Sequence, residues 1–152
     1  MRRLPTLHAP LESQVSVPGS KSHTNRALLI SALADGETTL QNALFSDDSN
    51  YFAQALVDLG FNVQLDPQLR MMKVRGLSGK IPTQVADLFI GNAGTAARFL
   101  TAMLTLGSGK YHLDGVKRMR QRPIGGLVAA LQGLGGQVKG LGSKESKNQD
   151  NF

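Results

Sequence analysis

The chain contains an internal repeat, and this repeat limits the possible folds more than any single motif does. The sequence ALVDLGFNV (55–63) is matched by ALQGLGGQV (130–138), and ADGETTLQN (34–42) is matched by GSGKYHLDG (107–115). Arg26 followed by ALL is matched by Arg98 followed by FLT. The spacing between the copies drifts only slightly, as small loop insertions would produce. We therefore expect two copies of one supersecondary unit.

Each copy is typical of a βαβα-like unit, with a glycine-containing turn, a helix, a short strand, a second helix ending in LG and a further strand. In the first copy we expect strands at GETTLQN and FNVQL, with MMKVRGL as a hairpin partner. In the second copy we expect strands at KYHLD and GQVKG. These units predict an α/β (α+β) fold.

The first helix is predicted by VPGSKSHTNRALLISALADG. Ser22 or Thr24 is a suitable N-cap, an apolar run follows, and Gly36 is a natural left-handed stop. The stretch is not an ATP-type phosphate loop, because the two glycines that GxxxxGK[ST] requires are missing.

Charged and polar residues gather at the starts of all four predicted helices. Capping explains Ser, Thr, Asp and Asn, but the first turn of a helix disfavours Lys and Arg unless an anion offsets their charge. If the helices of the two units pack side by side, these starts meet at one edge of the sheet. The pattern favours anion binding, although four independent capping motifs would look similar. The clusters are Lys21, Ser22 and Arg26; Asp47 and Asp48; Asn92, Gly94, Thr95 and Arg98; and Arg120, Arg122 and Pro123.

The segment GNAGTAARFLTAML (91–104) is also a predicted helix start suited to an anion, and it contains glycines. Gly91 and Gly94 permit a close backbone approach, and Asn92 and Thr95 offer amide and hydroxyl contacts. The segment follows the strand-like DLFI and opens a helix of small residues, which is typical of a phosphate or carboxylate cradle.

Composition excludes several classes of function. The 152 residues include no cysteine, and the three histidines lack ligand spacing, so we expect no disulfide and no metal site. No apolar run approaches the roughly 18 residues of a membrane span, and MRRLPTLHAP lacks an apolar signal core, so we expect a cytoplasmic protein. The net charge of +6 favours nucleic acid, anionic lipid or small phosphorylated and carboxylated metabolites as partners.

The cationic segment KRMRQRP (117–123) allows a competing interpretation as a nucleic-acid patch. Only Tyr111 lies near it in the sequence, and no aromatic stacking pattern accompanies it. We therefore expect neither a nucleic acid nor a membrane as a partner.

Taken together, four motifs make the chain resemble the 5-enolpyruvylshikimate-3-phosphate (EPSP) synthase family over about residues 6–140. The motifs are PGSKSHTNRALLISALADGETTL, SDD, LFIGNAGTAARFLTA and LDGVKRMRQRPIGGLV. The resemblance implies transfer of the enolpyruvyl group of phosphoenolpyruvate to the 5-hydroxyl of shikimate 3-phosphate, without a metal or organic cofactor. It also implies a fold of repeated βαβαββ units, of which the chain holds two of the three that make one domain.

The resemblance implies a role for each matching residue. Lys21 is implied to touch both substrates as a catalytic group, and Asp48 to act as a catalytic carboxylate that organises the first-turn network. Ser22 and Arg26 are implied to hold shikimate 3-phosphate. Arg98 is implied to be supporting. The groups implied on the phosphoenolpyruvate side are Asn92, Gly94, Thr95 and Arg122.

The chain departs from the family pattern at Phe99, where the family usually has proline. We expect this change to alter discrimination between phosphoenolpyruvate and its competitor glyphosate. The later acidic residues and basic clamp of the family are also missing, so we expect little or no turnover by this chain alone. The alternative is a noncatalytic anion-binding or interaction module.

The resemblance divides the chain into four segments. Residues 1–19 form an N-terminal strand segment that in the family pairs with the second domain, 20–84 the first unit, 85–140 the second unit, and 141–152 a polar tail whose composition predicts disorder. A missing third unit would leave an apolar helix face uncovered, so we expect self-association or a complementary C-terminal fragment.

Overall fold

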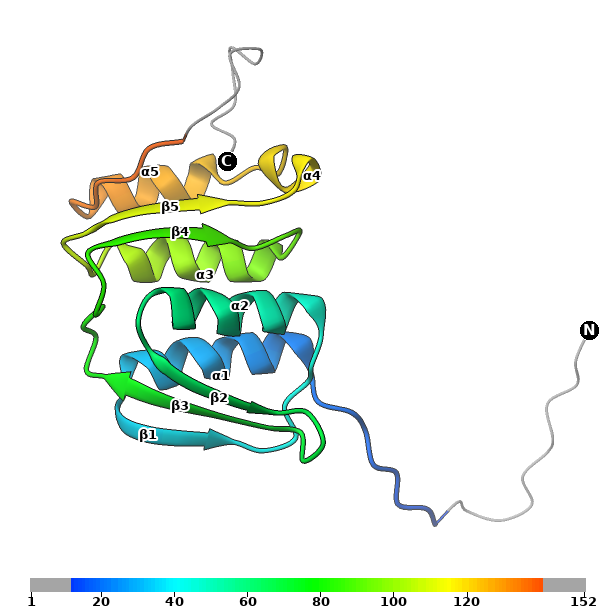
Figure 1. The fold of residues 1–152 in the computed structure, drawn as a ribbon. Coiled ribbons are helices and arrows are strands. Elements are labelled where there is room, and N and C mark those ends of the chain that lie inside the picture. Colours follow the sequence, from blue (N-terminus) through cyan, green and yellow to red (C-terminus); the bar gives the residue numbers. More distant parts are fainter. Residues whose placement is uncertain (1–11, 141–152) are drawn as a thin grey trace, which may run out of the picture.

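The computed structural model describes residues 12–140, and Figure 1 shows this part of the chain in colour. The predicted tail (141–152) and the first part of the predicted N-terminal strand segment (1–11) lie outside the described residues. Residues 12–20 form neither helix nor strand. The strand predicted for the N-terminal segment is therefore absent from the part of that segment which the structure describes.

The first unit contains two helices and three strands: α1 (Lys21–Leu33), β1 (Asp35–Leu40), α2 (Asp47–Asp58), β2 (Asn62–Asp66) and β3 (Met71–Leu77). The sheet has the order β1-β3-β2, and β3 runs antiparallel to both neighbours. The predicted hairpin is confirmed, because β2 pairs with β3 in a register that places Val63 opposite Val74.

The second unit contains β4 (Val85–Phe89), α3 (Gly94–Leu104), β5 (Lys110–Asp114), α4 (Lys117–Arg120) and α5 (Gly125–Gly133). β4 and β5 pair in parallel, and β5 coincides with the predicted strand KYHLD. The prediction of a strand at GQVKG is wrong, since this segment has no regular structure. In the first unit the matching strand, β2, pairs with β3, whereas residues 12–140 hold no counterpart of β3 for the second unit.

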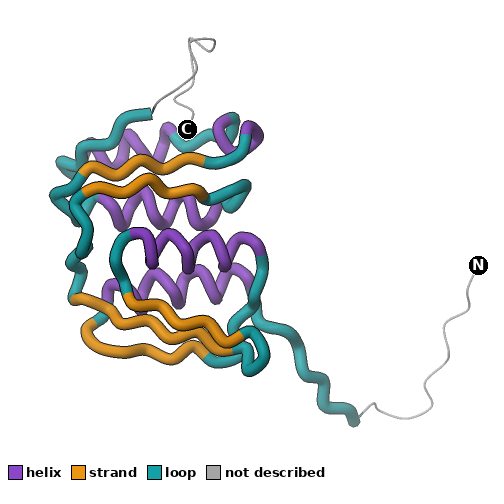
Figure 2. The backbone as a smooth tube through the Cα atoms, in the orientation of Figure 1, coloured by secondary structure: helices purple, strands orange, loops and turns teal. Residues whose placement is uncertain are grey.

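Helices α1, α2 and α3 lie between the three-stranded sheet and the β4–β5 pair, as Figure 1 and Figure 2 show. The contacts between these helices are made by small and apolar side chains, which form one continuous core. Leu28, Phe52 and Leu100, one from each helix, are completely buried. Burying each such side chain contributes about 1.5–3 kcal/mol. Within residues 12–140, no helix has the length and apolar character that crossing a bilayer requires.

The boundaries of α1 differ from those predicted. Ser20 is the N-cap and accepts a hydrogen bond from the backbone N–H of His23 at 3.4 Å, so Ser22 and Thr24 already lie inside the helix. Thr24 is buried, and its hydroxyl accepts from the N–H of Leu44 at 3.0 Å. Gly36 has the expected positive φ of 83°, but it lies within β1, after the helix has ended at Leu33.

The second helix of the second unit also begins later than predicted. α5 starts at Gly125 with Ile124 as its N-cap, so Pro123 does not start the helix. Arg120 is the last residue of the short helix α4. The other three clusters do lie at helix starts, namely those of α1, α2 and α3.

Candidate functional site

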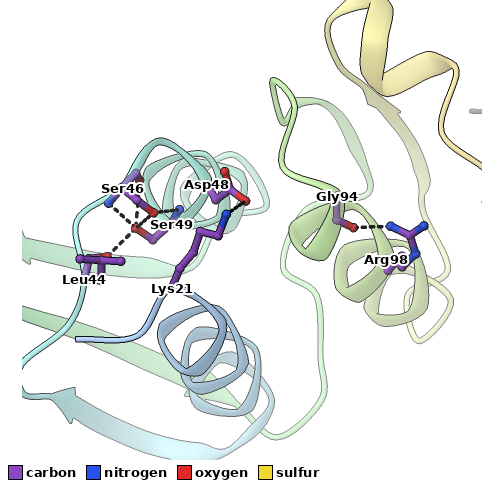
Figure 3. Close-up of polar contacts among 7 residues, drawn as sticks. All are labelled: Lys21, Leu44, Ser46, Asp48, Ser49, Gly94 and Arg98. Carbon is purple, nitrogen blue, oxygen red and sulfur yellow. Dashed lines mark hydrogen bonds and ion pairs between the residues drawn. The ribbon is translucent and has the colours of Figure 1, made fainter. Parts of the chain in front are cut away.

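The starts of α1 and α2 are joined by an ion pair. The Nζ atom of Lys21, the first residue of α1, lies 3.2 Å from Oδ2 of Asp48 in the first turn of α2 (Figure 3). The Lys21 side chain is 49% exposed and the Asp48 side chain 23% exposed. An exposed pair of this kind contributes little to stability, so the ammonium group is available to an incoming anion.

The start of α2 is fixed by a capping box (Figure 3). The backbone N–H of Ser46 donates to Oγ of Ser49 at 2.8 Å, and the N–H of Ser49 donates to Oγ of Ser46 at 3.4 Å. Ser49 is completely buried, and its hydroxyl also donates to the carbonyl of Leu44 at 2.6 Å. Reciprocal caps satisfy the N–H groups of a first turn and hold its backbone in place. The capping box therefore sets the position from which Asp48 reaches Lys21.

The start of α3 is arranged differently, because no side chain caps it. Its N-cap is Ala93, and its first turn contains no acidic residue. Gly91 lies just before it with a positive φ of 55°, a conformation in which a side chain would be strained. An uncapped helix start with close backbone access is a suitable site for an anion, as the glycine-containing segment predicts.

Two guanidinium groups flank the start of α3. Arg98 donates from Nη1 to the carbonyl of Gly94 at 3.0 Å, drawn in Figure 3, and from Nη2 to the carbonyl of Pro123 at 2.9 Å. A Cβ atom added to Gly94 would overlap Nη1 of Arg122 and lie 3.3 Å from Nη1 of Arg98. The absence of a side chain at Gly94 therefore allows both guanidinium groups to approach the helix start.

Arg120 has a different environment from Arg122. Its Nε donates to Oδ1 of Asp114 at 2.8 Å, and its Nη2 donates to Oδ2 at 2.6 Å. The hydrogen bond from Arg120 lowers the pKa of Asp114 below its usual 3.8, with a smaller contribution from the N–H of Gly115. Arg120 is thus paired within the chain and does not line the cavity that Arg122 lines. Among residues 12–140, Arg122 forms no salt bridge.

A cavity of about 550 Å³ lies where these helix starts meet. Six of the eight predicted site residues line it, and Ser22 and Arg26 do not. The cavity is lined by Lys21, Asp47, Asp48, Tyr51, Gly91, Asn92, Gly94, Thr95, Arg98, Val116 and Arg122.

Arg26 faces α3 instead of the cavity. Its Nη1 donates to the carbonyl of Ser22 at 3.3 Å, and its Cζ lies 5.9 Å from the centre of the Phe99 ring. Phe99 is half-buried against the core and does not line the cavity. Its expected influence on ligand discrimination could therefore reach the cavity only through neighbouring residues.

Tyr51 and Val116 also line the cavity, although neither was among the residues predicted for the site. Tyr51 follows Asp47 and Asp48 by about one turn of α2, a spacing that places all three on one side of the helix. This spacing could have revealed Tyr51. Val116 carried no such signal. It reaches the site because its N–H donates to the carbonyl of Gly91 at 2.9 Å, a bond that joins the segments following the parallel strands β5 and β4.

The family model for EPSP synthase (3-phosphoshikimate 1-carboxyvinyltransferase) matches residues 5–148. The chain is 56% identical over 132 residues to 3-phosphoshikimate 1-carboxyvinyltransferase of Trichormus variabilis, covering 87% of this chain and 31% of that protein. The corresponding protein of Laribacter hongkongensis is 47% identical over 135 residues, covering 89% of this chain and 32% of its own length.

Among solved structures, EPSP synthase from Acinetobacter baumannii matches with a TM-score of 0.74 and 26% sequence identity. The match covers 91% of this chain and 31% of that structure. The chain therefore spans just under a third of the length of these relatives. The agreement of sequence and fold over most of its own length shows that the chain belongs to the EPSP synthase family.

Proposed function

We propose that this chain supplies part of the substrate-binding site for transfer of the enolpyruvyl group from phosphoenolpyruvate to the 5-hydroxyl of shikimate 3-phosphate. The observation that carries the proposal is the cavity in which Lys21, Arg98 and Arg122 surround the uncapped start of α3. Both substrates carry a phosphate and a carboxylate. Backbone N–H groups and guanidinium groups are the donors that recognise these anions best.

The residue types suit division of the site into two sides. Arg122, with Asn92 and Thr95 at the glycine segment, is proposed to hold phosphoenolpyruvate, because a guanidinium group can bind carboxylate or phosphate through two parallel hydrogen bonds. Ser22 and Arg26 are proposed to hold shikimate 3-phosphate at the start of α1. Neither residue lines the cavity, so this part of the proposal requires Arg26 to leave its contact with Phe99.

Lys21 and Asp48 are proposed as the catalytic groups. In the net transfer, the 5-hydroxyl oxygen bonds to C2 of phosphoenolpyruvate, the bond from C2 to the phosphate oxygen breaks, and the proton lost by the hydroxyl is taken up by the departing inorganic phosphate. Lys21 is a mobile point charge that can follow the negative charge moving onto the departing phosphate. Asp48, at 3.2 Å, holds the ammonium group at the mouth of the cavity until a substrate anion competes for it.

We expect this chain alone to bind substrates with little or no turnover. The proposal also includes a cytoplasmic location, which cell fractionation would check. A noncatalytic anion-binding module from the same fold is the alternative. It would bind both substrates yet release no phosphate even when the rest of an EPSP synthase is supplied as a separate fragment.

Isothermal titration of the chain with phosphoenolpyruvate, alone and with shikimate 3-phosphate present, tests the proposal. Arg122→Ala should weaken phosphoenolpyruvate binding about tenfold or more, because a hydrogen bond to a charged group contributes about 1.5–3 kcal/mol. Arg118→Ala is the matched control, since Arg118 is an exposed arginine that does not line the cavity. Equal affinities for the two variants would remove Arg122 from the site, and a chain that binds neither substrate would overturn the proposal.

A further inference from the structure

Tyr51 is an aromatic residue in a cavity otherwise lined by charged, polar and small side chains. It lies on α2 about one turn beyond Asp47 and Asp48, and all three line the same cavity. None of the proposed substrate contacts involves Tyr51. Its contacts therefore indicate whether Tyr51 packs in the core or binds a ligand.

The ring of Tyr51 is held from two sides. A Cβ atom added to Gly91 would overlap Cε2 of the ring and lie 2.7 Å from Cζ, so the ring rests directly on the backbone of the glycine segment. Phe89 meets the ring edge-on, with centres 5.8 Å apart and planes at 76°. Edge-to-face pairs of this kind are favourable and fix ring orientation.

These contacts place the hydroxyl end of the ring at the glycine segment. The ring atoms nearest to Gly91 are Cε2 and Cζ, and Cζ carries the hydroxyl. Tyr51 is only half-buried, and within residues 12–140 its hydroxyl makes no hydrogen bond. The other tyrosine, Tyr111, has a partner, because its hydroxyl donates to the carbonyl of Thr83 at 2.9 Å. Because Tyr51 lines the cavity, its hydroxyl can donate to a ligand bound there.

We propose that Tyr51 is a further substrate-binding residue, whose hydroxyl donates a hydrogen bond to the phosphate or carboxylate group held between the start of α3 and Arg122. The inference rests on the proposed function, since it names another contact in the same site. A phenol donor adds a directed hydrogen bond to the charges of Lys21 and Arg122. Gly91 would serve this contact as well, because any side chain there would push the ring away from the cavity wall.

The composition of the chain provides a direct optical test. The chain has no tryptophan and two tyrosines. Tyr111→Phe therefore leaves Tyr51 as the one tyrosine whose fluorescence is measured, and Tyr51→Phe leaves Tyr111. Titration with phosphoenolpyruvate, with and without shikimate 3-phosphate, should change the tyrosine fluorescence of Tyr111→Phe. It should leave that of Tyr51→Phe unchanged.

Calorimetry of the same variants measures the contribution of the hydroxyl. Tyr51→Phe should bind phosphoenolpyruvate about tenfold more weakly, as expected for loss of one hydrogen bond to a charged group. Its thermal unfolding should match that of the parent chain, because the ring keeps its contacts with Gly91 and Phe89. If Tyr51 served only to pack its ring against Gly91 and Phe89, Tyr51→Phe would keep both the affinity and the stability of the parent chain.

The outcomes separate the inference from the proposed function. If the parent chain binds phosphoenolpyruvate and Tyr51→Phe binds it equally well, the role of Tyr51 is overturned and the proposed function stands. If the parent chain binds neither phosphoenolpyruvate nor shikimate 3-phosphate, both are overturned. Weaker binding by Tyr51→Phe, together with a fluorescence change in Tyr111→Phe, supports both.

Discussion

Substitution of Gly94 by alanine tests whether the start of α3 positions Arg122. The added Cβ would overlap Nη1 of Arg122. The guanidinium group would have to withdraw by roughly 1 Å to reach an ordinary contact of about 3.5 Å. A flexible side chain can make this movement without disturbing the backbone. We therefore expect the fold to tolerate the change and the site to lose its geometry.

The two effects have different magnitudes and different assays. Gly94 is the first residue of α3 and has no positive φ, so alanine there should leave the free energy of unfolding unchanged or raise it by up to about 1 kcal/mol, the helix-propensity difference. Displacing Arg122 by this distance should weaken phosphoenolpyruvate binding about tenfold to one hundredfold, as for loss of a charge-assisted hydrogen bond. Urea unfolding measures the first effect, and isothermal titration the second.

Gly126→Ala is the matched control. Gly126 lies in the first turn of α5, and a Cβ added there meets nothing within 4 Å. The Gly126→Ala variant should gain similar helix propensity, and its affinity for phosphoenolpyruvate should not change. The reasoning would be refuted if Gly94→Ala bound phosphoenolpyruvate as tightly as Gly126→Ala does, or if Gly94→Ala lost substantial stability.

Three further predictions concern the elements around the site. Arg120 lowers the pKa of Asp114, so the pair stabilises the folded chain above pH 3.8, the ordinary carboxyl pKa, and this stabilisation is lost as the pH falls through the lower pKa of the folded state. In thermal unfolding, the parent chain should be more stable than Arg120→Ala at neutral pH, and this difference in stability should vanish in acid. Phe99→Leu and Arg26→Gln, combined in a double-mutant cycle, should give a coupling energy of about 0.5–1 kcal/mol in urea unfolding, and additive effects would exclude the interaction. Ser49→Ala removes the buried hydroxyl of the capping box and should lower the free energy of unfolding by about 1–2 kcal/mol, whereas an unchanged midpoint in urea would show that the box is dispensable.

Local patterns in the sequence predicted the elements that depend on near neighbours. The hairpin of β2 with β3 was predicted from the two strand patterns FNVQL and MMKVRGL, and β5 coincides with KYHLD. The strand predicted at GQVKG does not form, and the reason is non-local. Its counterpart β2 has β3 as a partner, and a strand pattern without a partner has no ladder of hydrogen bonds to form.

The cap of α1 was misplaced for a related reason. Ser20, Ser22 and Thr24 are all acceptable N-caps by residue type, so the sequence did not distinguish between them. The buried hydroxyl of Thr24 accepts a hydrogen bond from Leu44, which lies on the loop before α2. That distant contact gives Thr24 a role inside the helix, which leaves Ser20 as the cap.

The sequence by itself determined that cations and glycines gather near helix starts, because charge, capping preference and repeat spacing are local properties of the chain. The tertiary structure decided which of these groups share a cavity. Arg120 and Arg122 are two residues apart, yet only Arg122 lines the cavity, whereas Arg120 at the end of α4 is paired with Asp114 at the end of β5. Packing of α1, α2 and α3 likewise brings Lys21, Tyr51 and Gly91 together across the core, and no local pattern encodes such distances.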